Sequence, residues 1–181
     1  MRVFLLIALF LTAQIAAAQD REGNDRPSDW VADHFTSFGG WDSVCDHRST
    51  DGVKEQRCYL RYVDVFSPRP KFAAQFIFVT PGPEIQIGLE RGTRFPKGGI
   101  RIEDMGGTLW KTDRILCRTG LSCTFDGEDA SILLSAMADG TVFAFDFTDR
   151  HGTPQTLRWD LTVFADALAD FRREAALRDL N

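Results

Sequence analysis

Two cysteines and two histidines near the start of the chain are of the types that bind metals. Cys45 and His47 are separated by one residue, Cys58 follows them, and His34 precedes them. Thiolate and imidazole groups are ligands for zinc and copper, so this set could hold such an ion. A disulfide between Cys45 and Cys58 would instead leave no thiolate to ligate. Because cysteines of exported proteins usually oxidise, we expect the disulfide, no metal and no other cofactor.

The other two cysteines, Cys117 and Cys123, could form a redox-active pair. Their separation is not the Cys-x-x-Cys spacing of redox motifs, and no thioredoxin-like βαβ pattern surrounds them. Thr119 and Gly120 lie between them and suit a tight reversal of the chain. The sequence therefore favours a structural disulfide.

Hydrolytic catalysis would need a nucleophile with a base, or a pair of carboxylates. The Gly-x-Ser-x-Gly motif is absent from the sequence. Acidic neighbours occur at 103–104 and 128–129, but adjacent strand residues point to opposite faces, and the second pair fits the first turn of a helix. We predict a protein that is not an enzyme. An uncharacterised periplasmic hydrolase, with a site assembled from residues distant in the chain, is the alternative. The three histidines lie in polar segments without a paired motif: His34, His47 and His151.

The first 18 residues have the pattern of a secretory signal peptide. Arg2 supplies the positive start, residues 3–11 form an apolar run, and three alanines at 16–18 precede Gln19. This run is too short to span a bilayer comfortably, and no later stretch is long enough, so we expect no transmembrane span after cleavage. An even number of cysteines in an exported chain favours disulfides. Proximity favours Cys45–Cys58 and Cys117–Cys123, with the two other connectivities still open.

Length and charge bound the class of protein. Removal of 18 of the 181 residues leaves a chain suited to one domain with a substantial core. The formal net charge is −5, and the sequence shows no clustered basic face of the kind that phosphate backbones require. We therefore expect no nucleic-acid partner.

Short alternating runs between glycine- and proline-rich turns dominate the rest of the chain. Helices are expected near 129–138 and 161–177, and a strand is expected to lead through Ile115 and Leu116 into Cys117. Many short strands of this kind predict an antiparallel β-sandwich with two short peripheral helices. The polar residues 19–40 are expected to form a loosely ordered N-terminal arm, before a domain at 41–177. The main expected strands are 41–45, 53–66, 71–79, 84–89, 100–103, 141–147 and 155–159.

The order and spacing of several segments resemble the invasion-associated locus B proteins of Gram-negative bacteria. The likeness covers roughly residues 41–168. This resemblance implies a periplasmic or envelope-associated β-sandwich with immunoglobulin-like architecture and no shared enzymatic activity. Family members tend to have glycine directly before the later cysteine, where this chain has Ser122. The segments that carry the resemblance are WDSVC at 41–45 with Cys58, IGLERG at 87–92, 99–104, the Cys117/Cys123 pair, 136–140, and 161–168 around Phe164.

The loop at 91–99 is the segment that most favours a contact with another molecule. It brings together Arg91, Arg94, Phe95 and Lys97, and aromatic and cationic side chains are typical of contact surfaces. The alternative is that Phe95 folds inward and the charges only solubilise the loop. We predict an exported protein that acts by non-catalytic interaction with an unknown envelope or host protein. The sequence leaves open its oligomeric state and whether it stays in the periplasm, associates with the outer membrane or is secreted.

Overall fold

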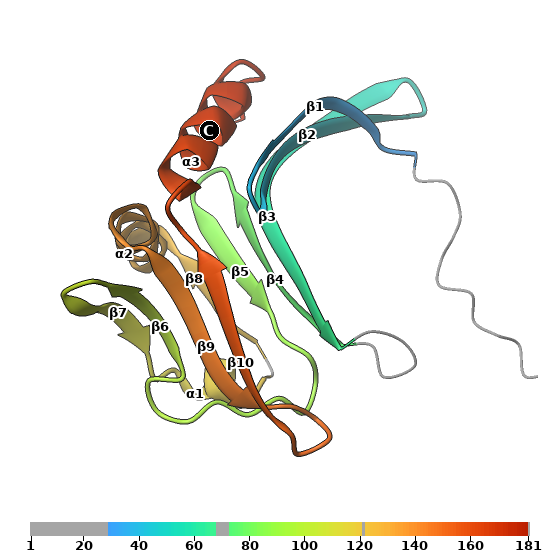
Figure 1. Ribbon diagram of the computed structural model, residues 1–181. Helices are drawn as coiled ribbons and strands as arrows, with labels where there is room; N and C mark the ends of the chain where they lie inside the picture. The colour runs from blue at the N-terminus through green and yellow to red at the C-terminus, as the bar shows by residue number, and fades with distance from the viewer. Residues whose placement is uncertain (1–28, 68–72, 121, 181) are drawn as a thin grey trace, which may run out of the picture.

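The computed structural model describes residues 29–67, 73–120 and 122–180, so the predicted signal peptide lies outside the described residues. Within the described residues, two antiparallel sheets and three helices form a β-sandwich, which confirms the predicted fold class (Figure 1). The larger sheet has the order β1-β2-β3-β4-β5-β8. Its strands are β1 (Val31–Phe38), β2 (Trp41–Thr50), β3 (Val53–Ser67), β4 (Ala73–Thr80), β5 (Glu84–Gly88) and β8 (Thr124–Asp126).

The smaller sheet has the order β10-β9-β6-β7. Its strands are β6 (Ile100–Asp104), β7 (Gly107–Thr112), β9 (Val142–Thr148) and β10 (Pro154–Asp160). Phe143, Phe145 and Phe147 all point from β9 into the core, as their alternation predicts. The two sheets thus enclose one shared hydrophobic core.

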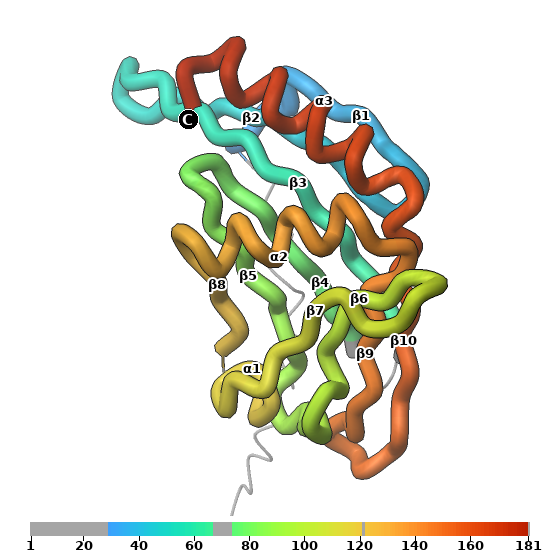
Figure 2. Tube along the Cα trace, turned by 90° about the vertical axis from the view of Figure 1, so that its left-hand side faces the viewer, coloured from blue at the N-terminus to red at the C-terminus, as the bar shows by residue number. Residues whose placement is uncertain are grey.

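Two of the helices cover the larger sheet on its inner face (Figure 2). Helix α3 (Phe164–Ala176) packs on β1, β2 and β3, whereas α2 (Gly127–Asp139) packs on β5 and β8 and on the edge formed by β6 and β7. The apolar stripe of α3 that the sequence indicated is buried, including Phe164, Leu168 and Phe171. Among the described residues, no helix is both long enough and apolar enough to cross a bilayer.

Tryptophans connect the layers at the centre of the core. Trp41 and Trp159 are fully buried, and each finds an acceptor for its indole N–H. Trp41 Nε1 donates to the carbonyl oxygen of Asp160 at 3.0 Å, and Trp159 Nε1 donates to Asp64 Oδ2 at 3.0 Å. Trp110 is partly buried at a sheet edge, where it packs against Phe125. All three tryptophans therefore serve in packing.

The N-terminal boundary of the domain differs from the prediction. Residues 31–38 of the expected loose arm form strand β1, which pairs with β2 from Phe38↔Trp41 onward. Their polar composition suits an edge strand, because one side of such a strand faces solvent. Gly39, with φ 59°, makes the hairpin turn just before Trp41. The composition change at residue 41 therefore marks a turn and not the start of the domain.

The segment between β2 and β3 also differs from the prediction. Strand β2 does not end at residue 45 as expected, because the polar residues 46–50 continue it. The turn itself is confined to Asp51 and Gly52, which have φ values of 52° and 81°. Asp-Gly is a preferred sequence for a two-residue hairpin turn, because both central residues need positive φ.

The segment before Cys117 is a single helical turn, α1 (Ile115–Arg118), and not the expected strand. The hydroxyl of Thr119 donates to the carbonyl oxygen of Ile115 at 2.9 Å and closes this turn. Ile115 and Leu116 would be expected to pack in the core if they belonged to a strand, but their side chains are 73% and 57% exposed. Alternation in so short a segment could not separate a strand from a helical turn.

Candidate functional site

The structure separates the two cysteines from the two histidines that could have joined them as metal ligands. Cys45 and Cys58 face each other across β2 and β3, and their sulfur atoms are bonded at 2.03 Å. His47 Nδ1 lies 2.8 Å from Asp33 Oδ1, and His34 contacts helix α3 instead. The thiolates that a soft metal would need are therefore consumed in the disulfide.

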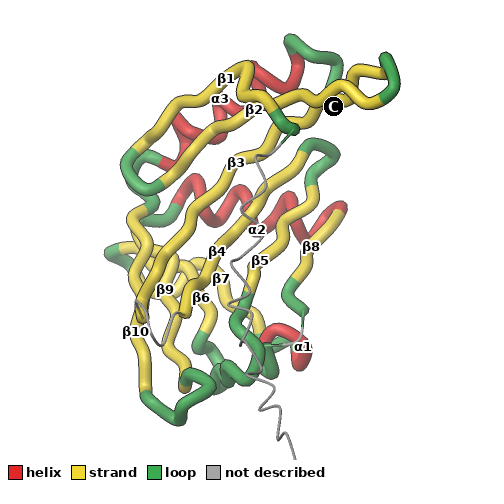
Figure 3. Tube along the Cα trace, turned by 90° about the vertical axis from the view of Figure 1, so that its right-hand side faces the viewer, coloured by secondary structure: helices red, strands yellow, loops and turns green. Residues whose placement is uncertain are grey.

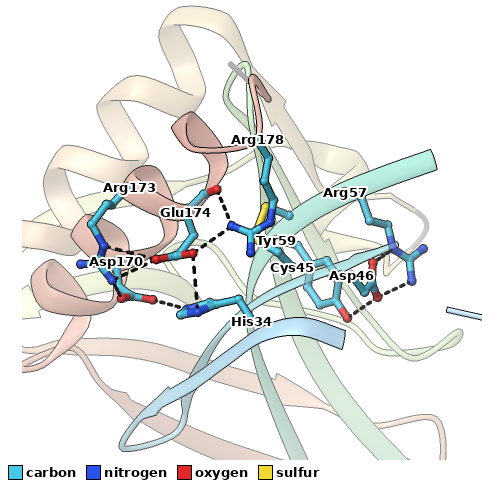
Figure 4. Close-up of a disulfide and its surroundings, with 10 residues drawn as sticks. His34, Cys45, Asp46, Arg57, Tyr59, Asp170, Arg173, Glu174 and Arg178 are labelled. Carbon is cyan, nitrogen blue, oxygen red and sulfur yellow. Dashed lines mark hydrogen bonds and ion pairs between the residues drawn. A yellow bond between two sulfur atoms is a disulfide. The ribbon is translucent and has the colours of Figure 1, made fainter. Parts of the chain in front are cut away.

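His34 joins a group of charged residues on α3 (Figure 4). Its Nε2 lies 2.8 Å from Asp170 Oδ2, and its Nδ1 lies 3.6 Å from Glu174 Oε2. Arg173 binds Asp170, and Arg178 Nη1 donates to Glu174 Oε2 at 2.8 Å. We call these five residues the His34 cluster. It joins edge strand β1 to the last helix of the chain.

The carboxyl groups of the His34 cluster are held in their charged form. Burial alone would raise the pKa of Asp170, but hydrogen bonds from His34 and Arg173 outweigh it, and the pKa is lowered. The hydrogen bond from Arg178 lowers the pKa of Glu174. Ligand atoms of His34, Asp170 and Glu174 lie within 4.8 Å of one another, as metal binding would require. The two arginines already balance the carboxylate charges, so we interpret the cluster as an ionic link between β1 and α3.

The acidic residues and the histidine that hydrolysis could have used contact arginines instead. Glu103 pairs with Arg101, and Asp129 pairs with Arg114. His151 lies in the turn between β9 and β10, where Arg150 Nε approaches its Nε2 at 3.1 Å. These side chains therefore belong to surface ion pairs and to a turn.

Phe95 in the predicted binding loop points inward and is only 3% exposed. Its ring centroid lies 5.1 Å from that of Phe147, and its backbone N–H donates to the carbonyl oxygen of Arg118 at 2.9 Å. Backbone hydrogen bonds between Arg94 and Thr148 tie the loop to β9. Phe95 therefore anchors the loop and is not available as a contact residue, because its ring gains more from burial in the core than from exposure to water.

The arginines of the same loop line a pocket with residues of α1. Arg91 and Arg94 come from the loop, and Arg118 comes from the end of α1. Together with Gly92, Phe95, Ile115 and Thr119, they surround a hollow of about 620 Å³, which we call the arginine pocket. Lys97 is exposed in the loop but does not line this pocket. The structure thus adds Arg118, which sequence reasoning did not select, and removes Phe95.

The charge of the arginine pocket is not balanced by nearby acids. In the described part of the chain, no carboxylate forms an ion pair with Arg91, Arg94 or Arg118. Glu90, which precedes the loop, has its Oε1 3.0 Å from Arg150. Arg118 uses its Nε to donate to the carbonyl oxygen of Phe95 at 3.3 Å. Three guanidinium groups therefore remain available to an anion at this site.

The second disulfide holds α1 beside the arginine pocket. Cys117 and Cys123 are bonded and buried, which is the nearest-neighbour pairing that the sequence favours. Gly120 has φ 67°, and a Cβ there would lie 2.7 Å from the carbonyl oxygen of Thr93. Only glycine allows this close approach of the disulfide loop to the 91–99 loop. The resembled family tends to have glycine at the position of Ser122, whereas this chain has Gly120. Gly120 thus joins the disulfide loop to the 91–99 loop.

A second, more apolar hollow lies between the β4–β5 turn and helices α2 and α3. Its volume is about 410 Å³, and its walls include Leu134, Leu168 and Phe171, with Arg172 as the charged residue. It brings fewer cationic groups together than the arginine pocket does. The arginine pocket is therefore the better candidate for a recognition site.

Comparison with known proteins gives one similar structure. No family model and no curated protein matches the chain. The crystal structure of invasion associated protein B from Bartonella henselae is similar with a TM-score of 0.44 and 15% sequence identity. The match covers 81% of this chain and 97% of that chain. Its name is that of the family which the sequence resembles.

Proposed function

We propose that the protein is exported from the cytoplasm and acts without catalysis, by binding a partner at the bacterial envelope through the arginine pocket and α1. Export is supported by the signal-peptide pattern of residues 1–18. It is also supported by the two disulfides, which persist in oxidising compartments. The resemblance to invasion-associated locus B proteins supports an envelope location.

The observation that carries the proposed binding function is the unbalanced charge of the arginine pocket. Arg91, Arg94 and Arg118 lack an acidic partner among the described residues, in a chain whose overall charge is negative. Arginine is enriched at contact surfaces because its planar group can form several hydrogen bonds with one acceptor group. Ile115 adds an exposed aliphatic side chain to the same pocket. A partner with an anionic group next to an apolar surface would satisfy both features.

Photo-crosslinking in living cells tests this assignment. A crosslinking residue at Thr119, which lines the pocket and is exposed, should capture the partner in the wild-type protein. Arg91→Glu and Arg94→Glu should abolish the crosslink, because a reversed charge repels an anionic partner. Arg172→Glu is the matched control, since Arg172 is also exposed but lies on α3. Equal capture by all four proteins would show that the partner binds another surface.

A further inference from the structure

The partner of the arginine pocket can be specified further from the chemistry of its surroundings. We propose that the protein docks on a surface of anionic phospholipid, with a lipid phosphate in the arginine pocket and with Ile115 and Leu116 in the headgroup layer. This inference rests on the proposed function and deepens it, because it names the class of partner.

The exposed aliphatic residues of α1 are the first observation that points to a lipid layer. Ile115 and Leu116 are adjacent, and their side chains are 73% and 57% exposed. Ile115 lines the arginine pocket and, with Leu116, also lines a neighbouring hollow of about 300 Å³. Neither side chain gains from its contact with water, whereas insertion beneath the headgroups would bury both.

The position of α1 makes this insertion sterically possible. The helix lies at one end of the sandwich, opposite the end where α3 packs (Figures 1 and 3). The turn between β9 and β10, which carries Arg150 and His151, lies at the same end. A flat surface could therefore meet α1 without first contacting the helices that cover the larger sheet.

The rigidity of α1 is the second observation. The buried Cys117–Cys123 disulfide directly follows the two aliphatic residues, and the Thr119 hydroxyl closes the turn. Gly120 holds the loop against Thr93. Because these contacts order α1 in the free protein, little conformational entropy would be lost when Ile115 and Leu116 enter a membrane surface.

The cations around α1 are the third observation. Arg91, Arg94 and Arg118 are free to form bidentate hydrogen bonds with phosphate oxygens, as guanidinium groups favour. Cationic groups near an anionic membrane are attracted to its surface potential. An acidic protein could use the same charges, but it would not require two aliphatic side chains that protrude beside them. The combination of cations and protruding aliphatics therefore favours a phospholipid surface.

Sedimentation with vesicles tests the proposal. The disulfide-bonded mature protein would be mixed with vesicles of phosphatidylcholine alone or with added phosphatidylglycerol. We expect binding only to the anionic vesicles, and we expect it to weaken as salt is added, because salt screens the attraction. Arg94→Glu and the double variant Ile115→Ser/Leu116→Ser should each weaken binding by about tenfold or more, from lost charge attraction and lost apolar insertion.

Two matched controls separate this surface from general effects of charge and hydrophobicity. Arg172→Glu reverses an exposed arginine on α3, and Ile132→Ser removes a half-exposed isoleucine on α2. Both should bind anionic vesicles like the wild type. Free inorganic phosphate should compete only weakly, because it can occupy the pocket without engaging Ile115 and Leu116. Full displacement by phosphate would indicate a small-anion site and overturn the proposal.

The outcomes distinguish this inference from the proposed function. If anionic vesicles are not bound while the crosslink at Thr119 still depends on Arg91 and Arg94, the partner is not a phospholipid and the proposed function stands. If the captured partner is an acidic protein whose binding ignores Ile115→Ser/Leu116→Ser, the lipid proposal is also overturned. If the wild-type protein shows neither the crosslink nor binding to anionic vesicles, both proposals are contradicted.

Discussion

Gly88 shows how closely single residues are fitted on the outer face of the larger sheet. It pairs with Phe76 across β4 and β5, and a Cβ at Gly88 would lie 1.9 Å from the Phe76 ring. The ring thus covers the glycine, an arrangement that shields backbone which glycine would otherwise leave exposed. Sequence pattern alone predicted an alternating strand at this position, but the need for glycine arises from its neighbour.

We predict that Gly88→Ala lowers the free energy of unfolding by about 1–3 kcal/mol, because the methyl group must displace the Phe76 ring. Urea unfolding would measure the change. Gly106→Ala is the control, since Gly106 has open space around it and should tolerate alanine. Phe76→Leu should partly rescue Gly88→Ala by removing the clashing ring. A Gly88→Ala protein as stable as the wild type would contradict the tight packing described here.

Asp170 makes the stability of the folded protein depend on pH. Its lowered pKa means that the folded state stabilises the charged carboxylate more than the unfolded state does. The resulting stabilisation is present above the unfolded pKa, which is about 4, and is lost as the pH falls through the folded pKa. Glu174 contributes in the same direction, because its pKa is also lowered.

We predict that Asp170→Asn reduces stability at pH 7 by about 1–2 kcal/mol, as expected for lost hydrogen bonds to a charged group. The variant should also show a weaker decline in stability between pH 5 and pH 3 than the wild type. Thermal unfolding across this range would measure both effects. Asp166→Asn serves as the control, since Asp166 is an exposed residue of the same helix. Parallel pH profiles for the wild type and Asp170→Asn would rule out the His34 cluster as an acid-sensitive link.

At the scale of elements, the two disulfides have different tasks. Cys45–Cys58 joins strands β2 and β3, which already pair along the whole length of β2. Cys117–Cys123 instead fixes α1, a single helical turn outside the two sheets. Loss of the first should therefore affect stability, whereas loss of the second should also affect the arginine pocket.

We predict that Cys45→Ala/Cys58→Ala costs about 3 kcal/mol and Cys117→Ala/Cys123→Ala about 2 kcal/mol, from the lengths of the loops that they close. Denaturant unfolding would measure these values. Hydrogen exchange at α1 should increase only in the second variant, because local order there depends on the bridge. Unchanged exchange at α1 would mean that the bridge does not organise the pocket.

At the scale of the whole molecule, the described helices pack on only one face of the larger sheet. Phe76 and Phe78 lie on the opposite, outer face and are partly exposed, whereas Ile77 and Val79 of the same strand are buried in the core. Among the described residues, no helix or strand packs over this outer face (Figure 3). Strand β4 is apolar on both faces, and it has a paired strand on each side.

The proposed export is tested on the whole chain. We predict that protein purified from the native bacterium begins at Gln19 and contains no free thiol, because signal peptidase and the oxidising periplasm act before folding is complete. Intact-mass measurement with and without a thiol-reactive label would test both points. Full-length protein with four labelled cysteines would contradict export.

Much of the architecture could be predicted from the sequence because it depends on local physics. Alternation placed most strands, the helical stripe placed α3, and proximity favoured the two disulfides. The elements that were missed or misplaced include β1, β7 and α1, whose short or polar segments carry weak periodicity. The sequence of the 91–99 loop also predicted Arg91 and Arg94 as residues of the candidate site. It did not decide whether Phe95 points outward or into the core, where it is buried.

The chain by itself determined which residues alternate, where turns begin and which cysteines lie close together, since these properties depend on neighbours in sequence. Only the tertiary structure decided that Phe95 turns toward Phe147, that Arg118 joins Arg91 and Arg94, and that His34 meets Asp170. Each of these contacts joins residues on different elements. Their approach is set by how the sheets and helices pack, and no periodicity within one segment encodes that packing.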